Sequence, residues 1–226
     1  MGIARDGTVF ADLAIDGLDV GVCVGGQVVH RYTPPSSPTL DLSTLGAPTL
    51  TFAPGTTNIS QYANTSTAVH PSQSAVMRAA VSFPNTAHTG CIYEGGGSGV
   101  GTFLGTLAAR DSLVFRAGHG GSDNDTPNDG KASLEVPYAQ IAGQTGELVW
   151  EMGLPGGKIR TRLWFRGVLL GDVTSTGAQT KHSGGNGGGY GIGYSSICAG
   201  CTTDAVPAGM LMSDMDYWKQ KTVPPQ

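Results

Sequence analysis

The sequence predicts an all-β protein, in which two packed antiparallel sheets form a sandwich and a small β-hairpin arm precedes it. Gly and Pro account for 36 and 13 of the 226 residues, together roughly twice their usual share, so we expect no long helix. They punctuate the chain about every eight to twelve residues, a spacing typical of sandwiches and barrels. The segments between them are rich in Val, Leu, Ile, Phe, Tyr and Thr, which favour strands.

The expected strands are about a dozen short segments, most of them with Gly, Pro, Asn, Asp or Ser on at least one side. In chain order they cover residues 17–24, 27–32, 49–52, 74–83, 90–94, 99–108, 112–117, 132–136, 146–152, 158–165, 168–172, 190–194 and 209–218. This number of short strands suits two packed sheets rather than one.

The first two strands form the predicted arm. Apolar residues alternate on both sides of Gly25-Gly26, and a two-residue hairpin turn needs positive φ at both of its positions. An isolated hairpin is at best marginally stable in water. We therefore expect a neighbouring subunit to cover the arm's apolar residues, which are Val22, Val24, Val28 and Val29.

A proline-rich spacer, Thr-Pro-Pro-Ser-Ser-Pro, follows the arm. Neither a helix nor a central strand tolerates such a sequence. We therefore expect residues 1–37 to form the arm and linker, residues 38–218 the sandwich domain, and residues 219–226 a polar tail.

The best-patterned strands are 158–165 and 168–172, a hairpin whose turn is Arg166-Gly167. Alternation places one set of side chains on the inner face, namely Ile159, Thr161, Leu163 and Phe165. The other face carries Arg160, Arg162, Trp164 and Arg166. Arginine stems can cover an indole while their charged heads stay in water. This pattern is typical of a solvated sheet face; the alternative is a glycan-binding surface made of these four residues.

Four segments of the second half carry a family resemblance when they are taken in order. They are Leu148-Val149-Trp150, the run from Arg162 to Leu170, Gly189-Tyr190-Gly191-Ile192-Gly193, and the run from Ala208 to Trp218. Their order resembles the C-terminal half of a concanavalin A-like jelly roll of the laminin-G/pentraxin kind, over about residues 75–218. The resemblance implies a jelly-roll sandwich and a lectin-like function. Arg166 stands where that family usually has Asn, so no role of that Asn is carried over.

A second resemblance lies in the arm. The segment from Gly21 to Pro35 is similar to the leader hairpin of bacteriophage tail and capsid-associated proteins. It implies a structural or decoration protein of the virion, assembled in the host cytoplasm, with other virion proteins, further copies of the chain and a host-surface or environmental glycan as partners. The alternative is a secreted carbohydrate-binding module or glycoside hydrolase.

Composition and carboxylate spacing exclude several function classes. A net charge of −4 does not favour nucleic-acid binding, and no apolar run is long enough to cross a bilayer. Glycosidases need two facing carboxylates roughly 5–10 Å apart. The nearest pair, Glu147 and Glu151, lies four residues apart, or about 13 Å along a strand. We therefore expect a non-enzymatic protein.

Two further clusters leave alternatives open. Asp123, Asp125, Asn128 and Asp129 concentrate oxygen donors after a Gly-rich turn; they form either a polar turn or a Ca²⁺ site, and we expect no other cofactor. Cys198 and Cys201 have the spacing of a zinc knuckle or a redox motif, yet they lie in a Gly/Thr loop. A disulfide that staples this loop, free thiols and a metal site all remain open.

Overall fold

The computed structural model describes residues 40–52, 73–97, 100–119, 130–179, 189–190 and 206–224, together with the backbone of four N-terminal strands. The chain divides into two compact units, Met1–Thr39 and Leu40–Gln226. Each unit is considered by itself.

The N-terminal unit is a four-stranded antiparallel sheet in the order β1-β2-β3-β4. Its strands are β1 (Ile3–Arg5), β2 (Thr8–Phe10), β3 (Val20–Val24) and β4 (Gln27–Tyr32). The predicted hairpin is β3–β4, in which Val24 pairs with Gln27. The first two strands were not expected, although Asp6-Gly7 between them is a strong hairpin signal. The side chains of Val22, Val24, Val28 and Val29 lie outside the described residues, so their need for a covering surface stays a prediction.

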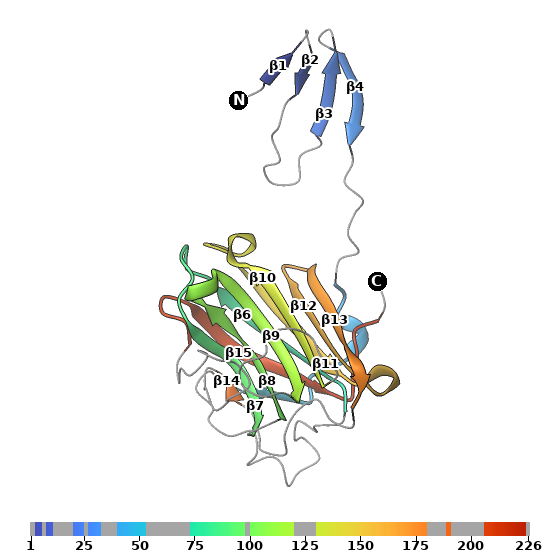
Figure 1. Cartoon of the computed structure of the whole chain (residues 1–226), viewed down its shortest axis with the longest axis vertical. Coiled ribbons are helices and arrows are strands. Elements are labelled where there is room, and N and C mark those ends of the chain that lie inside the picture. Colours follow the sequence, from blue (N-terminus) through green and yellow to red (C-terminus); the bar gives the residue numbers. More distant parts are fainter. Residues whose placement is uncertain are drawn as a thin grey trace. The chain divides into compact units, whose positions relative to one another are not determined.

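The second unit is a jelly-roll sandwich of two antiparallel sheets (Figure 1). The five-stranded sheet has the order β10-β9-β8-β7-β14 and the six-stranded sheet the order β13-β12-β11-β6-β15-β5. The first comprises β7 (Gly90–Gly97), β8 (Val100–Leu107), β9 (Ser112–His119), β10 (Lys131–Pro137) and β14 (Gly189–Tyr190). The second comprises β5 (Leu50–Phe52), β6 (Ala75–Ser82), β11 (Thr145–Gly153), β12 (Lys158–Phe165), β13 (Val168–Ala178) and β15 (Leu211–Lys219).

Most expected strands coincide with observed ones within a few residues. The largest difference is β13, which continues to Ala178 instead of ending at residue 172. Short 3-10 turns at Ser43–Leu45, Ala108–Arg110, Tyr138–Gln140 and Pro155–Gly157 connect some of the strands. Among the described residues no helix is long and apolar enough to span a membrane.

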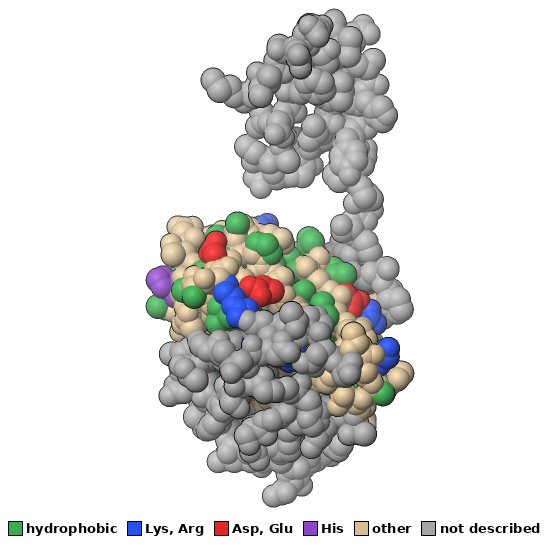
Figure 2. Space-filling view, viewed as in Figure 1, with side chains coloured by type: hydrophobic (Ala, Val, Ile, Leu, Met, Phe, Trp, Pro, Cys, Tyr) green, Lys and Arg blue, Asp and Glu red, His purple; other side chains and the backbone are tan. Residues whose placement is uncertain are grey.

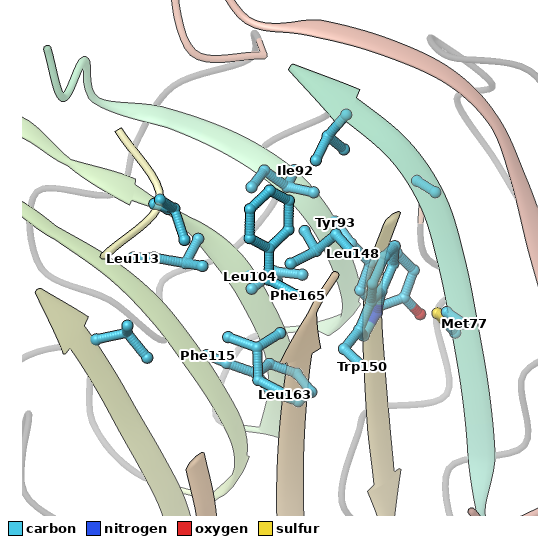
Figure 3. Close-up of a cluster of buried hydrophobic side chains, with 14 of the residues drawn as sticks. Met77, Ile92, Tyr93, Leu104, Leu113, Phe115, Leu148, Trp150, Leu163 and Phe165 are labelled. Atoms are coloured by element: carbon cyan, nitrogen blue, oxygen red, sulfur yellow. The ribbon is translucent and has the colours of Figure 1, made fainter. Parts of the chain in front are cut away.

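The main core lies between the two sheets and follows the pleat of the strands. Leu163 and Phe165 point inward from β12, as the alternation predicts; Leu163 lies beside Phe115 of the facing sheet, and Phe165 beside Leu104 (Figure 3). Tyr93 and Trp150 also meet there, with ring centroids 5.9 Å apart. Fully burying one large apolar side chain stabilises the fold by about 1.5–3 kcal/mol.

A second apolar cluster covers the outer face of the six-stranded sheet. It consists of Leu45, Val76, Val149, Trp164, Trp218 and Val223, with Leu40 and Leu42 packed against it. We call residues 40–46 the strap, because this segment lies over that face and Trp218 Nε1 donates a 2.9 Å hydrogen bond to its Gly46 O. Residues 219–226 were expected to be a polar tail. Instead Lys219 ends β15, and Val223 is buried in this cluster.

Candidate functional site

The β12–β13 hairpin places the four predicted glycan-binding residues in three different environments. As predicted, Arg160, Arg162 and Trp164 share the outer face of β12, and the turn falls at Arg166-Gly167. Arg166 and Gly167 have φ values of 52° and 79°, as a hairpin turn of the primed type requires. The structure does not bring the four residues together as one open surface.

Trp164 lies beneath the strap and is 1 % exposed. The guanidinium carbon of Arg162 stands 4.9 Å from its ring centroid, so an arginine does cover the indole, but as part of a buried cluster. The prediction that this outer face of β12 is exposed to solvent is therefore wrong around Trp164. Apolar side chains of the strap cover the face there and displace water from it. Trp164 has no surface to offer a sugar.

Arg162 and Glu151 form a buried ion pair on the same face. Arg162 Nε and Nη2 donate to the two oxygens of Glu151 at 3.2 and 2.6 Å. The C-terminal segment completes the arrangement, since Val223 N–H donates to Glu151 Oε2 at 2.6 Å and Val223 O accepts from Arg162 Nη2 at 2.5 Å. Burial raises the pKa of Glu151, and the hydrogen bonds from Arg162 and Val223 oppose that rise. This pair is structural.

Arg160 is bound to Asp172 of the neighbouring strand. Its Nε donates at 2.7 Å to Asp172 Oδ1, and its Nη2 pairs with Oδ2, so both charges are compensated. These hydrogen bonds and the nearby carboxylates raise the pKa of Arg160. A hollow of about 260 Å³ lies beside Arg160 and Arg162, with Leu154 and Pro155 among its lining residues.

Arg166 is held in place although its side chain is exposed. Its backbone N–H donates to Glu147 O at 2.9 Å. Its stem crosses Gly146 so closely that a Cβ there would stand 2.4 Å from Arg166 Cγ. Its Nη1 donates to Gln144 Oε1 at 3.2 Å. Three contacts with the start of β11 therefore fix the direction of the guanidinium.

A hollow of about 370 Å³ opens beside this guanidinium at the turn end of the hairpin. We call it the turn hollow; its lining residues are Gln140, Gln144, Phe165, Arg166, Val168 and Leu170. Gln140 ends the 3-10 turn Tyr138–Gln140, and Gln144 directly precedes β11. Gln144 Nε2 donates to Gln140 O at 2.9 Å. Pockets that combine an apolar wall with a few converging polar groups are typical binding sites.

Glu147 and Glu151, the two carboxylates considered as a catalytic pair, each contact an arginine. Glu147 is ion-paired with Arg78 at 3.2 Å, and Arg78 also pairs with Asp216. Glu151 is 4 % exposed and bound to Arg162. Of the residues that the structure describes, no group of three or more His, Cys, Asp or Glu is placed to hold a metal ion.

Two predicted clusters fall outside the described residues. They are the calcium candidates Asp123, Asp125, Asn128 and Asp129, and the cysteine pair Cys198 and Cys201. Both hypotheses stay predictions. Cys91, in contrast, lies within the described residues and is buried in β7.

Sequence reasoning missed Gln140 and Gln144. They lie in a turn between strands, more than twenty residues before Arg166, and glutamine has no motif of its own. The one signal in the sequence that could have indicated this site is Arg166 itself, which stands where the jelly rolls that the chain resembles usually have Asn. An arginine in a turn that demands positive φ is unfavourable for the fold alone.

No family model matches the chain, and no curated protein matches it. Among solved structures, the chain is similar to the CBM40 module of the Ruminococcus gnavus IT-sialidase bound to α2,3 sialyllactose, with a TM-score of 0.52 and 12 % identity over 79 % of this chain and 95 % of that one. The α2,6 sialyllactose complex of that module gives 0.49 at the same identity and coverage. The mouse laminin α1 domains LG4-5 give 0.43 at 12 % identity, over 82 % of this chain and 44 % of that one. At such identities the similarity concerns the fold.

Proposed function

We propose that this protein is a non-catalytic, lectin-like glycan-binding protein whose site is the turn hollow. The observation that carries the proposal is Arg166, a non-glycine residue at φ 52° whose guanidinium is braced over a hollow. Such backbone conformations cost about 1–3 kcal/mol and cluster at functional sites. The fold is shared with a carbohydrate-binding module, which supports the proposal but does not by itself assign a function.

The chemistry of the turn hollow suits a sugar. A pyranose offers hydroxyl groups that donate and accept, and C–H faces that pack on apolar surface. The amides of Gln140 and Gln144 can do both, and Arg166 donates. Val168 and Leu170 supply the apolar wall, with the buried Phe165 behind them. Val168 is 49 % exposed, so part of that wall is open to a ligand.

A glycan panel followed by calorimetry on the best ligand tests this proposal. Arg166→Ala and Gln144→Ala should each weaken binding about tenfold or more, because each removes a hydrogen-bonding group from a largely preformed site. Arg110→Ala is the matched control, since Arg110 belongs to the other sheet and pairs with Glu135. Equal loss in all three variants, or none in the first two, would place the ligand elsewhere.

The absence of catalysis is a separate part of the proposal. Glu147 and Glu151 are each engaged by an arginine, and the two lie four residues apart on one strand. Incubation with α- and β-glucans and galactans should release no reducing ends. Turnover that disappears in Glu147→Gln or Glu151→Gln would contradict this part.

We also propose that the chain works as a decoration or tail-associated protein of a bacteriophage virion, with its N-terminal unit as the assembly element. The supporting observation is that residues 1–39 form a unit of their own, a single four-stranded sheet, which cannot enclose a core between two layers. Deleting residues 1–39 should leave the sandwich folded and abolish oligomers or incorporation into particles. A full-length monomer that the deletion destabilises would show that the arm packs within its own chain.

A further inference from the structure

The arginines of the sandwich differ in how their charge is compensated. Four of those that the structure describes, Arg78, Arg110, Arg160 and Arg162, are ion-paired with carboxylates. Arg116 is fully buried and donates from Nε to Ser133 Oγ. Arg166 has an amide as its hydrogen-bond partner, and no carboxylate of the described residues lies within ion-pairing distance.

Arg166 lacks a carboxylate partner among the described residues even though the chain contains more acidic than basic side chains. The chain has 17 acidic and 13 basic side chains, and both acidic and basic groups appear on the described part of the visible face (Figure 2). Glu147, whose backbone carbonyl accepts from Arg166 N–H, turns its own carboxylate to Arg78. The turn hollow is consequently lined by one cation and no anion.

The bracing of Arg166 leaves much of its guanidinium available. Nη1 is used by Gln144, and no other described hydrogen bond occupies the side chain. A guanidinium is a planar fork whose parallel N–H groups match the two oxygens of a carboxylate, and such bidentate pairs are among the strongest hydrogen bonds in proteins. A donor that is already oriented loses little side-chain entropy on binding.

We infer that the turn hollow selects glycans that carry a carboxylate, which Arg166 binds through its fork. This inference rests on the proposed function and names its ligand class. The amides of Gln140 and Gln144 receive the hydroxyl groups next to the carboxylate, and the exposed Val168 and the half-buried Leu170 pack on the ring. Charge-assisted hydrogen bonds of this kind correspond to a preference of about 10- to 100-fold over a neutral sugar of the same shape.

Calorimetry on the full-length chain tests the inference with three matched oligosaccharides, which end in glucuronate, in glucose, or in glucose 6-sulfate. We expect the glucuronate ligand to bind at least tenfold more tightly than the other two, and its affinity to fall as salt is raised. Arg166→Gln should remove the preference while weak binding of the glucose ligand persists. Arg166→Lys should retain part of it, because an ammonium keeps the charge but loses the fork. Thermal melts and Arg110→Gln serve as controls for folding and for general charge.

The outcomes separate the inference from the proposed function. Equal affinity for the glucuronate and glucose ligands overturns the carboxylate preference and leaves glycan binding intact. Equal affinity for the sulfated and carboxylated ligands shows that charge alone is recognised, which also overturns it. Persistence of the preference in Arg166→Gln assigns it to other residues. If none of a wider panel of acidic and neutral glycans binds, the inference and the proposed function both fail.

Discussion

Replacing either partner of the buried Arg162–Glu151 pair should destabilise the protein, but by unequal amounts. Glu151→Leu leaves a guanidinium that is 5 % exposed and cannot lose its proton. Arg162→Met leaves a carboxyl whose pKa is already raised by burial, and losing Arg162 removes hydrogen bonds that oppose that rise. The carboxyl can then take up a proton and become neutral, which limits the cost.

The magnitudes follow from the contacts that are lost. An unpaired buried charge costs about 3–5 kcal/mol, so we expect that loss in Glu151→Leu, equivalent to a melting temperature lower by about 6–20 °C. Arg162→Met should cost about 1–3 kcal/mol, the penalty for buried groups that lose their partners. The double variant should be more stable than Glu151→Leu, because it buries neither charge.

Urea unfolding at two pH values measures these differences. In Arg162→Met the raised pKa of Glu151 stabilises the folded state below the unfolded-state value of about 4.3, and this contribution is lost as the pH rises through the folded-state value. The loss of stability in Arg162→Met, measured against the wild type at the same pH, should therefore be smaller at pH 5 than at pH 7. An Arg162→Met loss as large as that of Glu151→Leu, or strictly additive losses in the double variant, would refute the reasoning.

Three further substitutions test other parts of the hairpin. Arg166→Asn should raise the free energy of unfolding by up to about 1 kcal/mol, because Asn tolerates positive φ, while glycan binding weakens about tenfold or more as in Arg166→Ala; a less stable variant would argue against backbone strain. Gly146→Ala should push the Arg166 stem aside, since the new Cβ would stand 2.4 Å from its Cγ, and calorimetry should show weaker binding with little change in melting temperature. Gly171→Ala should cost about 1–3 kcal/mol in urea unfolding, because its Cβ would stand 2.3 Å from Leu134 Cδ1; no change would mean that Leu134 moves freely.

The sequence predicted the features that depend on neighbouring residues. The β12–β13 hairpin, its turn at Arg166-Gly167 and the division of β12 into two faces follow from local alternation and turn chemistry. The fold class follows from Gly and Pro spacing. The sequence signal of Asp6-Gly7 for a hairpin between the first two strands is of the same local kind.

The environments of the site residues depended on distant segments and could not be predicted. Trp164 is buried because the strap, residues 40–46, lies over it, and that segment consists of Asp, Ser, Thr and Gly with isolated leucines. Val223 is one apolar residue in a polar C-terminal stretch, so its burial has no periodic signal. Arg162 and Arg160 look alike in sequence, yet cross-strand pairing gives them different acids, Glu151 and Asp172.

The position of β15 also constrains how the protein is made. In the six-stranded sheet β15 lies between β6 and β5, and Thr51 of β5 bonds to Asp216 of β15 across 165 positions. A nascent chain that has left the ribosome as far as β13 therefore exposes the unpaired edge of β6 for the whole time needed to synthesise β15. Such an edge invites pairing with another unfinished chain. The six-stranded sheet can be completed only after β15 has left the ribosome. Fragments that stop before β15 should therefore accumulate as aggregates rather than as a smaller sandwich.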